Sequence, residues 1–250
     1  SAFAFKPGVW ESSGYLPHHE PQIFDLKDAP MKAVTSKLIT SKADGVGHMI
    51  LNQPEKRNAI AYEMWQGIAV TADDYASDDS IRVVVISGAG DKAFSAGADI
   101  SQFAEKRSDK AATDDYNATV RKALEAVDRL GKPTIAMVQG FCVGGGMSLA
   151  THFDMRIASD DSRFGIPAAK LGLAYRWEDV RALVQLIGPT FTREILYTGR
   201  LFDATEARQM GLVNRVMPQS ELQAFVSDYA ARIAANAPLT VRSVKETVNQ

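Results

Sequence analysis

The 250-residue sequence has very little cysteine and no surplus of positive charge. Cys142 is its single cysteine, which excludes an internal disulfide and a metal site built from several cysteines. Lys and Arg number 28 against 30 Asp and Glu, so no basic excess is available to neutralise a phosphate backbone or an anionic membrane surface. We therefore expect neither nucleic acid nor membrane as a partner. The sparse cysteine suits a reducing compartment, and we expect a cytoplasmic protein.

We also expect no targeting signal and no membrane span. The first residues do not join a basic segment to an apolar one, which argues against a signal peptide. The longest uncharged stretch, residues 133–153, contains the triplet Gly144-Gly145-Gly146, and such glycines are costly in a lipid-exposed helix. We interpret it as a buried strand, a glycine turn and a helix. The histidines show no metal-ligand spacing, so we predict no metal; they are His18, His19, His48 and His152.

Hydrophobic residues make up 46% of the chain and charged residues 23%, which is typical of a globular protein. We predict an N-terminal arm or linker over 1–32, an α/β core over 33–187 and a C-terminal helical region over 188–250. The core alternates strands with helices, which favours parallel pairing. The expected strands are 33–41, 46–52, 81–87, 134–139 and 154–159, and the expected helices are 60–77 and 113–130. Residues 203–206 (DATE) resemble a capping box that starts a later helix.

Two segments combine glycine, small residues and a predicted strand-to-helix junction. They are residues 93–100 (AFSAGADI) and residues 140–149 (GFCVGGGMSL). Glycine lets the backbone approach a ligand, and the first N–H groups of a helix have no partner within it. A carbonyl oxygen between two such N–H groups would be polarised, and an enolate there would be stabilised. The alternative is tight packing of helix on strand with no chemical role.

These segments resemble the enoyl-CoA hydratase/isomerase (crotonase) superfamily. The similarity continues in LNQPEKRNAI, RFGIPAAKLGL and GRLFDATEARQMGLVNRV, and it covers residues 33–250. It implies an α/β spiral of ββα units with a C-terminal helical region for trimerisation, as a homotrimer or a dimer of trimers. It also implies an acyl-CoA thioester as ligand, with no cofactor because coenzyme A is part of the substrate.

The resemblance further implies roles for single residues. The thioester oxygen would lie between the backbone N–H groups of Ala98 and Gly145. Arg57 and Ala59 would lie near the nucleotide, and Asp99 and Ile100 would line the adenine side.

The sequence departs from this family at the acid and base. The two glutamates that hydratases use would fall at Ser148 and Ala168, and neither is a carboxylate. General acid–base groups contribute about 10²–10⁴-fold, so efficient hydration by the usual residues is not expected. The chain is then an enzyme that stabilises a thioester enolate, a non-catalytic acyl-CoA-binding or structural homologue, or an acyl-CoA hydrolase or decarboxylase.

A second departure follows at residues 175–179 (YRWED), where hydratases carry glycines. Either Glu178 or Asp179 replaces the missing carboxylates, with Tyr175 or Arg176 holding the acyl end, or the acidic pair caps the helix that begins there.

Two further groups have chemical alternatives. Ser148 approximates a nucleophile elbow with His152 one turn later, but a small pocket-lining role suits it better because an elbow serine meets its histidine from a distant loop. Cys142 lies in an apolar run and is interpreted as buried and inert.

Overall fold

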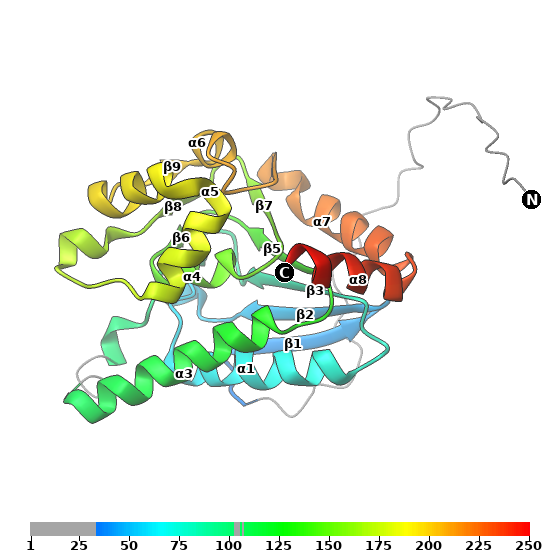
Figure 1. The fold of residues 1–250 in the computed structure, drawn as a ribbon, viewed down its shortest axis with the longest axis horizontal. Helices are drawn as coiled ribbons and strands as arrows, with labels where there is room; N and C mark the ends of the chain where they lie inside the picture. Colours follow the sequence, from blue (N-terminus) through cyan, green and yellow to red (C-terminus); the bar gives the residue numbers. More distant parts are fainter. Residues whose placement is uncertain (1–33, 103–105, 107) are drawn as a thin grey trace, which may run out of the picture.

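The computed structural model describes residues 34–102, 106 and 108–250, so the arm predicted for 1–32 lies outside the described residues. Two β-sheets and the helices around them make up this part (Figure 1). The strands are β1 (Leu38–Ala43), β2 (Val46–Leu51), β3 (Val83–Gly88), β4 (Ala93–Ser95), β5 (Thr134–Val138), β6 (Phe141–Val143), β7 (Met155–Ser159), β8 (Arg163–Gly165), β9 (Phe202–Asp203) and β10 (Arg215–Met217). The α-helices are α1 (Tyr62–Ser77), α3 (Lys110–Asp128), α4 (Gly145–Thr151), α5 (Trp177–Thr198), α6 (Ala204–Gln209), α7 (Gln219–Ala234) and α8 (Pro238–Val248). Short 3-10 helices are η1 (Pro54–Lys56), η2 (Ile100–Gln102) and η3 (Pro167–Leu171).

The larger sheet has the strand order β1-β2-β3-β5-β7-β10. β1 and β2 are antiparallel, and the turn between them holds Asp44 and Gly45 at positive φ of 51° and 80°. The remaining pairs in this sheet are parallel. The predicted strands, the turn and the parallel core are therefore confirmed, although β1 starts five residues later than the predicted strand at 33.

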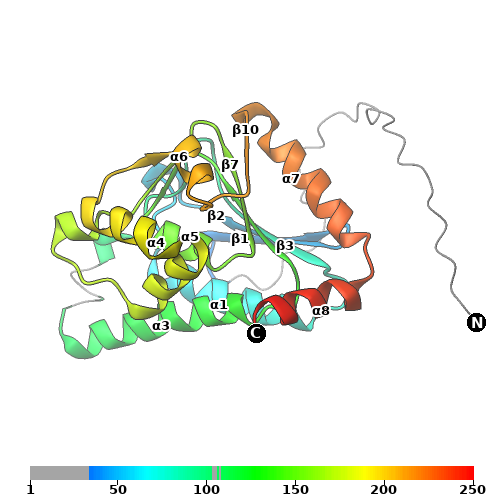
Figure 2. The same ribbon diagram turned by 45° about the horizontal axis from the view of Figure 1, so that its top comes forward.

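Alternate residues of β3 enter two different cores. Val83 and Val85 pack in a cluster with Val226 of α7, whereas Val84 and Ile86 belong to the larger core that includes residues of α1 and α3. Figures 1 and 2 show α1 and α3 side by side along one side of the sheet and α7 on the other. A strand covered on both faces is what a run of β-branched residues predicts.

The smaller sheet has the order β4-β6-β8-β9 and carries the two glycine segments. β4 and β6 have three residues each, too short for a hydrophobic period to reveal them from sequence. They pair in parallel, so their carboxyl ends lie at the same edge. Gly97 follows β4, and Gly144 and Gly145 follow β6, which places the two glycine turns next to each other.

The side chain of Asn58 links the loop before α1 to the turn between β3 and β4 by hydrogen bonds. It is fully buried and has a positive φ of 54°. Its Oδ1 accepts from the N–H of Gln53 (3.0 Å), and its Nδ2 donates to the carbonyls of Ala89 (2.9 Å) and Ala93 (2.7 Å). The loop therefore delivers Ile60 to the backbone that follows β4.

The chain beyond residue 187 contributes to both sheets. α5 is kinked at Gly188 (φ 74°, ψ 170°), next to Pro189, where the predicted domain boundary falls. Beyond it β9 pairs with β8 and β10 pairs with β7, so this region is not purely helical. Asp203 accepts from Glu206 N (2.8 Å) and Glu206 accepts from Asp203 N (3.1 Å), which confirms the predicted capping box. No helix within the described residues is both long and apolar enough to cross a membrane.

Candidate active site

The two glycine turns bring the backbone of Ala98 close to that of Gly145. Gly97 has a φ of 108° and Gly144 a φ of 53°, conformations that glycine adopts without strain. A Cβ added to Gly145 would lie 3.4 Å from the Ala98 nitrogen, and one added to Gly97 would lie 3.6 Å from the Gly145 nitrogen. Glycine at both positions therefore keeps the space between the two nitrogens free of side chains.

Both amides are left without an acceptor among the described residues. The flanking groups are engaged, because Ile60 N donates to Gly97 O (2.7 Å) and Asp99 N donates to Ile60 O (3.0 Å), which fixes the backbone on each side of Ala98. Gly145 is the first residue of α4, where N–H groups have no partner inside the helix. Both N–H groups are therefore free of internal acceptors in the described part of the chain, and the helix N-terminus at Gly145 favours negative charge nearby.

Ser148 and Asp179 meet beside this glycine turn. Ser148 is buried on α4, one turn after Gly145, and its hydroxyl donates to Oδ1 of the buried Asp179 on α5. Arg176 holds the other oxygen of Asp179 through Nε (2.8 Å) and Nη2 (2.7 Å). Tyr175 donates its hydroxyl to the carbonyl of Gly144 (3.2 Å). The structure thus brings Ser148, Tyr175, Arg176 and Asp179 together.

The two acidic residues of α5 have different surroundings. Asp179 is 3% exposed and its carboxylate is bound by side chains, while no side chain caps the first turn of the helix at Arg176. Glu178 lies on the exposed surface beside it. The structure therefore separates the pair: Asp179 is buried in contact with Ser148 and Arg176, whereas Glu178 is exposed.

Electrostatics keep Asp179 ionised. Burial alone would raise the pKa of Asp179, but His152, the charge of Arg176 and the hydroxyl of Ser148 outweigh it and lower the pKa. Burial raises the pKa of Tyr175, and the charge of Asp179 adds to this, so the phenol keeps its proton as a donor. The site therefore contains a carboxylate that can accept a proton and a hydroxyl between it and the glycine turn.

Ala168, at the second glutamate position, is buried on η3 and supplies no polar group. Its carbonyl accepts from Leu173 N (3.0 Å), which closes the turn that leads to α5. Cys142 is 0% exposed, and burial raises the pKa of its thiol, in agreement with the inert interpretation.

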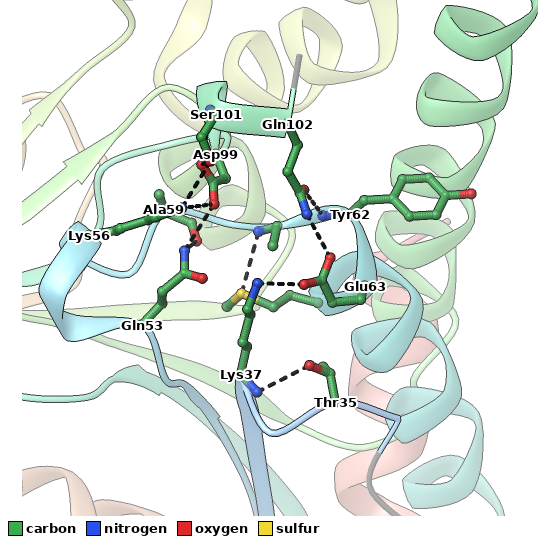
Figure 3. A network of polar contacts seen from close by, with 12 residues as sticks. Thr35, Lys37, Gln53, Lys56, Ala59, Tyr62, Glu63, Asp99, Ser101 and Gln102 are labelled. Atoms are coloured by element: carbon green, nitrogen blue, oxygen red, sulfur yellow. Dashed lines mark hydrogen bonds and ion pairs between the residues drawn. The ribbon is translucent and has the colours of Figure 1, made fainter. Parts of the chain in front are cut away.

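Asp99 organises the loops near Ala98 (Figure 3). Its Oδ2 accepts from Lys56 Nζ (2.9 Å) and Gln53 Nε2 (3.2 Å), and its Oδ1 accepts from the Ser101 hydroxyl (2.6 Å). Burial opposes the charge of Asp99, but these bonds lower its pKa to about 2. Its carboxylate is therefore engaged within the chain, and its backbone N–H holds the strand-like contact with Ile60.

The other residues assigned to the nucleotide side lie around the same loops. Arg57 is exposed, with its guanidinium 5.1 Å from the centre of the Phe141 ring. Ile100 is 74% exposed, whereas Ala59 is buried and its carbonyl accepts from Gln53 Nε2 (3.1 Å). These positions leave Arg57 and Ile100 open to a ligand, while Ala59 offers only backbone.

Sequence reasoning missed two features of the site. His152 lies between Asp128 of α3 and Asp179 of α5, a meeting of three helices that no local spacing predicts. Trp65 of α1 is 1% exposed, and its Cζ2 would lie 3.7 Å from a Cβ on Gly145. Its apolar setting in a helix gave no signal beyond core packing.

Among the described residues, no group of three His, Cys, Asp or Glu side chains is arranged to hold a metal.

Comparison with known proteins places this fold among α/β structures of the crotonase type. A crystal structure of an enoyl-CoA hydratase/carnithine racemase from Magnetospirillum magneticum superposes with a TM-score of 0.83 at 36% identity, covering 86% of this chain and 80% of that one. A short-chain-enoyl-CoA hydratase from Clostridium acetobutylicum is 32% identical over 86% of this chain and 82% of that protein. A crotonyl-CoA hydratase from Syntrophomonas wolfei is 35% identical over 85% and 81%.

The family model described as enoyl-CoA hydratase/isomerase matches residues 41–250. The chain belongs to the enoyl-CoA hydratase/isomerase family, within the crotonase superfamily.

Proposed function

We propose that this protein is an enzyme that binds an acyl-CoA thioester and stabilises its enolate between the N–H groups of Ala98 and Gly145. The observation that carries the proposal is a pair of amides at adjacent glycine turns that have no acceptor in the described part of the chain. Donors fixed before the reaction stabilise developing negative charge because they need no reorganisation. The hydratase names of its relatives support the thioester as substrate.

The acid–base group in this proposal is Asp179 acting through Ser148. A proton leaving C2 of the acyl group passes to the Ser148 oxygen while the Ser148 hydroxyl proton passes to Asp179, and the electron pair of the C–H bond moves to the thioester oxygen. Return of the proton at another carbon completes an isomerisation. In a hydration, the oxygen of a water molecule bonds to C3 of a conjugated enoyl thioester while a water proton passes through Ser148 to Asp179, and the resulting enolate takes that proton back at C2. Asp179 thereby replaces the two glutamates that Ser148 and Ala168 do not supply.

The remaining parts of the proposal concern binding and assembly. Arg57 and Ile100, with Ala59 and Asp99 beneath them, form the nucleotide side, and Tyr175 borders the acyl side. The enzyme uses no cofactor beyond the coenzyme A of its substrate. It works as a homotrimer or dimer of trimers in the cytoplasm.

A binding protein without catalysis is the second candidate, since both glutamate positions are occupied by residues that are not carboxylates. Proton exchange at C2 of butyryl-CoA in D₂O separates the two, because it reports enolate formation whichever reaction follows. We expect deuterium to be incorporated at C2, and mass spectrometry measures this incorporation. Retention of butyryl-CoA without exchange would establish the binding protein. Hydrolysis or decarboxylation would appear in the same spectra when a mixed acyl-CoA panel is used.

The role of Asp179 is tested with a matched pair of variants. Asp179→Asn should lower the exchange rate by about 10²–10⁴-fold, the usual contribution of a general base. Glu178→Gln makes the same chemical change at the exposed neighbour and should leave the rate unchanged. Equal rates in both variants would remove Asp179 from the mechanism.

A further inference from the structure

His152 is a buried residue at the junction of three helices. It is the C-cap residue of α4, and its side chain is 7% exposed. Its Nδ1 lies 2.8 Å from Oδ1 of Asp128 at the end of α3, and its Nε2 lies 3.8 Å from Oδ1 of Asp179 in α5. This is the same carboxylate oxygen that accepts the Ser148 hydroxyl. His152 therefore lies near the Asp179 oxygen that Ser148 binds, whereas Arg176 holds the other oxygen.

The Nε2 atom of His152 has no hydrogen-bond partner among the described residues although it is buried. A buried donor without a partner is costly, so its orientation needs a reason. The 3.8 Å gap to Asp179 is too long for a hydrogen bond and short enough for attraction between charges. The ring is thus aimed at Asp179 and fixed from behind by Asp128.

The surroundings favour the charged form of His152. Burial disfavours the imidazolium, but the carboxylates of Asp128 and Asp179 outweigh it and raise the pKa of His152 to about 9. The charged groups that face this arrangement are Asp128 from α3, and Asp179 and Arg176 from α5. Anions and cations therefore alternate from the half-exposed Asp128 through His152 and the buried Asp179 to the half-buried Arg176.

We propose that His152 and Asp128 are positioning residues for Asp179: the imidazolium of His152, held at Nδ1 by Asp128, keeps the Asp179 carboxylate ionised and turned toward Ser148. This inference rests on the proposed function, because it assigns the role through Asp179. His152 and Asp128 do not touch the reacting atoms. They orient Asp179, in the same way that the third residue of a catalytic triad orients the general base.

A purely structural cross-link between α3, α4 and α5 is the competing interpretation. In both cases the ion pairs stabilise the fold, fully below the ordinary histidine pKa of about 6.5 and progressively less as the pH rises through about 9. Stability alone therefore does not distinguish them. The pH dependence of activity does, because a cross-link without a positioning role does not affect the rate at which Asp179 accepts a proton.

The first measurement follows the two side chains by NMR, without substrate. We expect His152 to titrate near pH 9 in the wild type and closer to its ordinary value in Asp128→Asn. In His152→Gln the pKa of Asp179 should rise, because one of its two cations is gone. Glu125→Gln is the matched control, since it removes a half-exposed carboxylate one turn earlier on α3 and should leave both titrations unchanged. If the pKa of Asp179 is the same in His152→Gln as in the wild type, the inference is overturned.

The second measurement is C2 exchange of butyryl-CoA in D₂O against pH, at pH values where circular dichroism shows each variant folded. We expect an alkaline decline near pH 9 in the wild type, a decline at lower pH in Asp128→Asn, and a rate about tenfold to a hundredfold lower without that decline in His152→Gln. Profiles that match the wild type in both variants overturn the inference and leave the proposed function intact. Absence of exchange in the wild type at every pH overturns the proposed function and this role with it.

Discussion

Replacing Gly145 with alanine should abolish most activity while leaving the fold intact. The added Cβ would lie 3.4 Å from the Ala98 nitrogen and 3.7 Å from both Gly97 C and Trp65 Cζ2, which are ordinary contact distances. The residue lies at the start of α4, where exchange of glycine for alanine changes the free energy of unfolding by about 1 kcal/mol or less. The methyl group nevertheless occupies the space in front of the Ala98 amide, where the thioester oxygen is proposed to bind.

The expected loss follows from the value of one oxyanion donor. Removing such a donor costs about 10²–10³-fold in rate, or about 2.7–4 kcal/mol of transition-state stabilisation. C2 exchange of butyryl-CoA measures the rate, and urea denaturation followed by circular dichroism measures the stability. We expect Gly145→Ala to lose the rate and keep the urea midpoint.

Gly146→Ala provides the contrast at the next residue. Its Cβ would lie 2.6 Å from Ser95 Cβ and 2.8 Å from the Ser95 carbonyl, so the backbone of α4 or β4 must shift. This variant should lose stability and activity together. A Gly145→Ala enzyme that exchanges at the wild-type rate would refute the placement of the thioester oxygen, because that atom and the methyl group cannot share the space.

Two further predictions concern the frame of the site. Asn58→Ala should lower the free energy of unfolding by about 3 kcal/mol or more in denaturant titrations. The substitution leaves buried backbone groups of Gln53 and Ala93 without partners and places alanine at positive φ. A change below about 1 kcal/mol would contradict the anchoring role of Asn58. Cys142 should react with a disulfide reagent only when the protein unfolds, since its thiol is fully buried and its pKa is raised; stoichiometric labelling of the native protein within minutes would show that β6 opens.

The parts of the fold that could be predicted are those with a long hydrophobic period. The run of β-branched residues in β3 and the amphipathic pattern of α1 are local signals, and the structure confirms both. The smaller sheet escaped prediction because β4, β6 and β8 have three residues each and are defined by their partners. β10 was hidden for the same reason, since pairing with β7 makes three residues a strand.

In the candidate site too, features set by local sequence could be predicted and features set by tertiary packing could not. Its glycine turns are visible in sequence because positive φ and close backbone approach require a particular residue, as at Gly97 and Gly144. The sequence alone left Glu178 and Asp179 equivalent, and only the direction of the first turn of α5 separates them. The contact of His152 with Asp128 joins residues 24 positions apart on two helices, so it depends on tertiary packing that no spacing encodes.

The backbone around Ala98 determines which substitutions this part of the chain can accept. The peptide on either side is clamped, since Gly97 and Asp99 both bond to Ile60 and Asp99 is gripped by Lys56, Gln53 and Ser101. Position 98 itself contributes only its main chain to this arrangement. We therefore expect position 98 to accept other small side chains, whereas proline is excluded because it has no N–H. The neighbours are less replaceable, because Gly97 needs its positive φ and Asp99 needs its carboxylate.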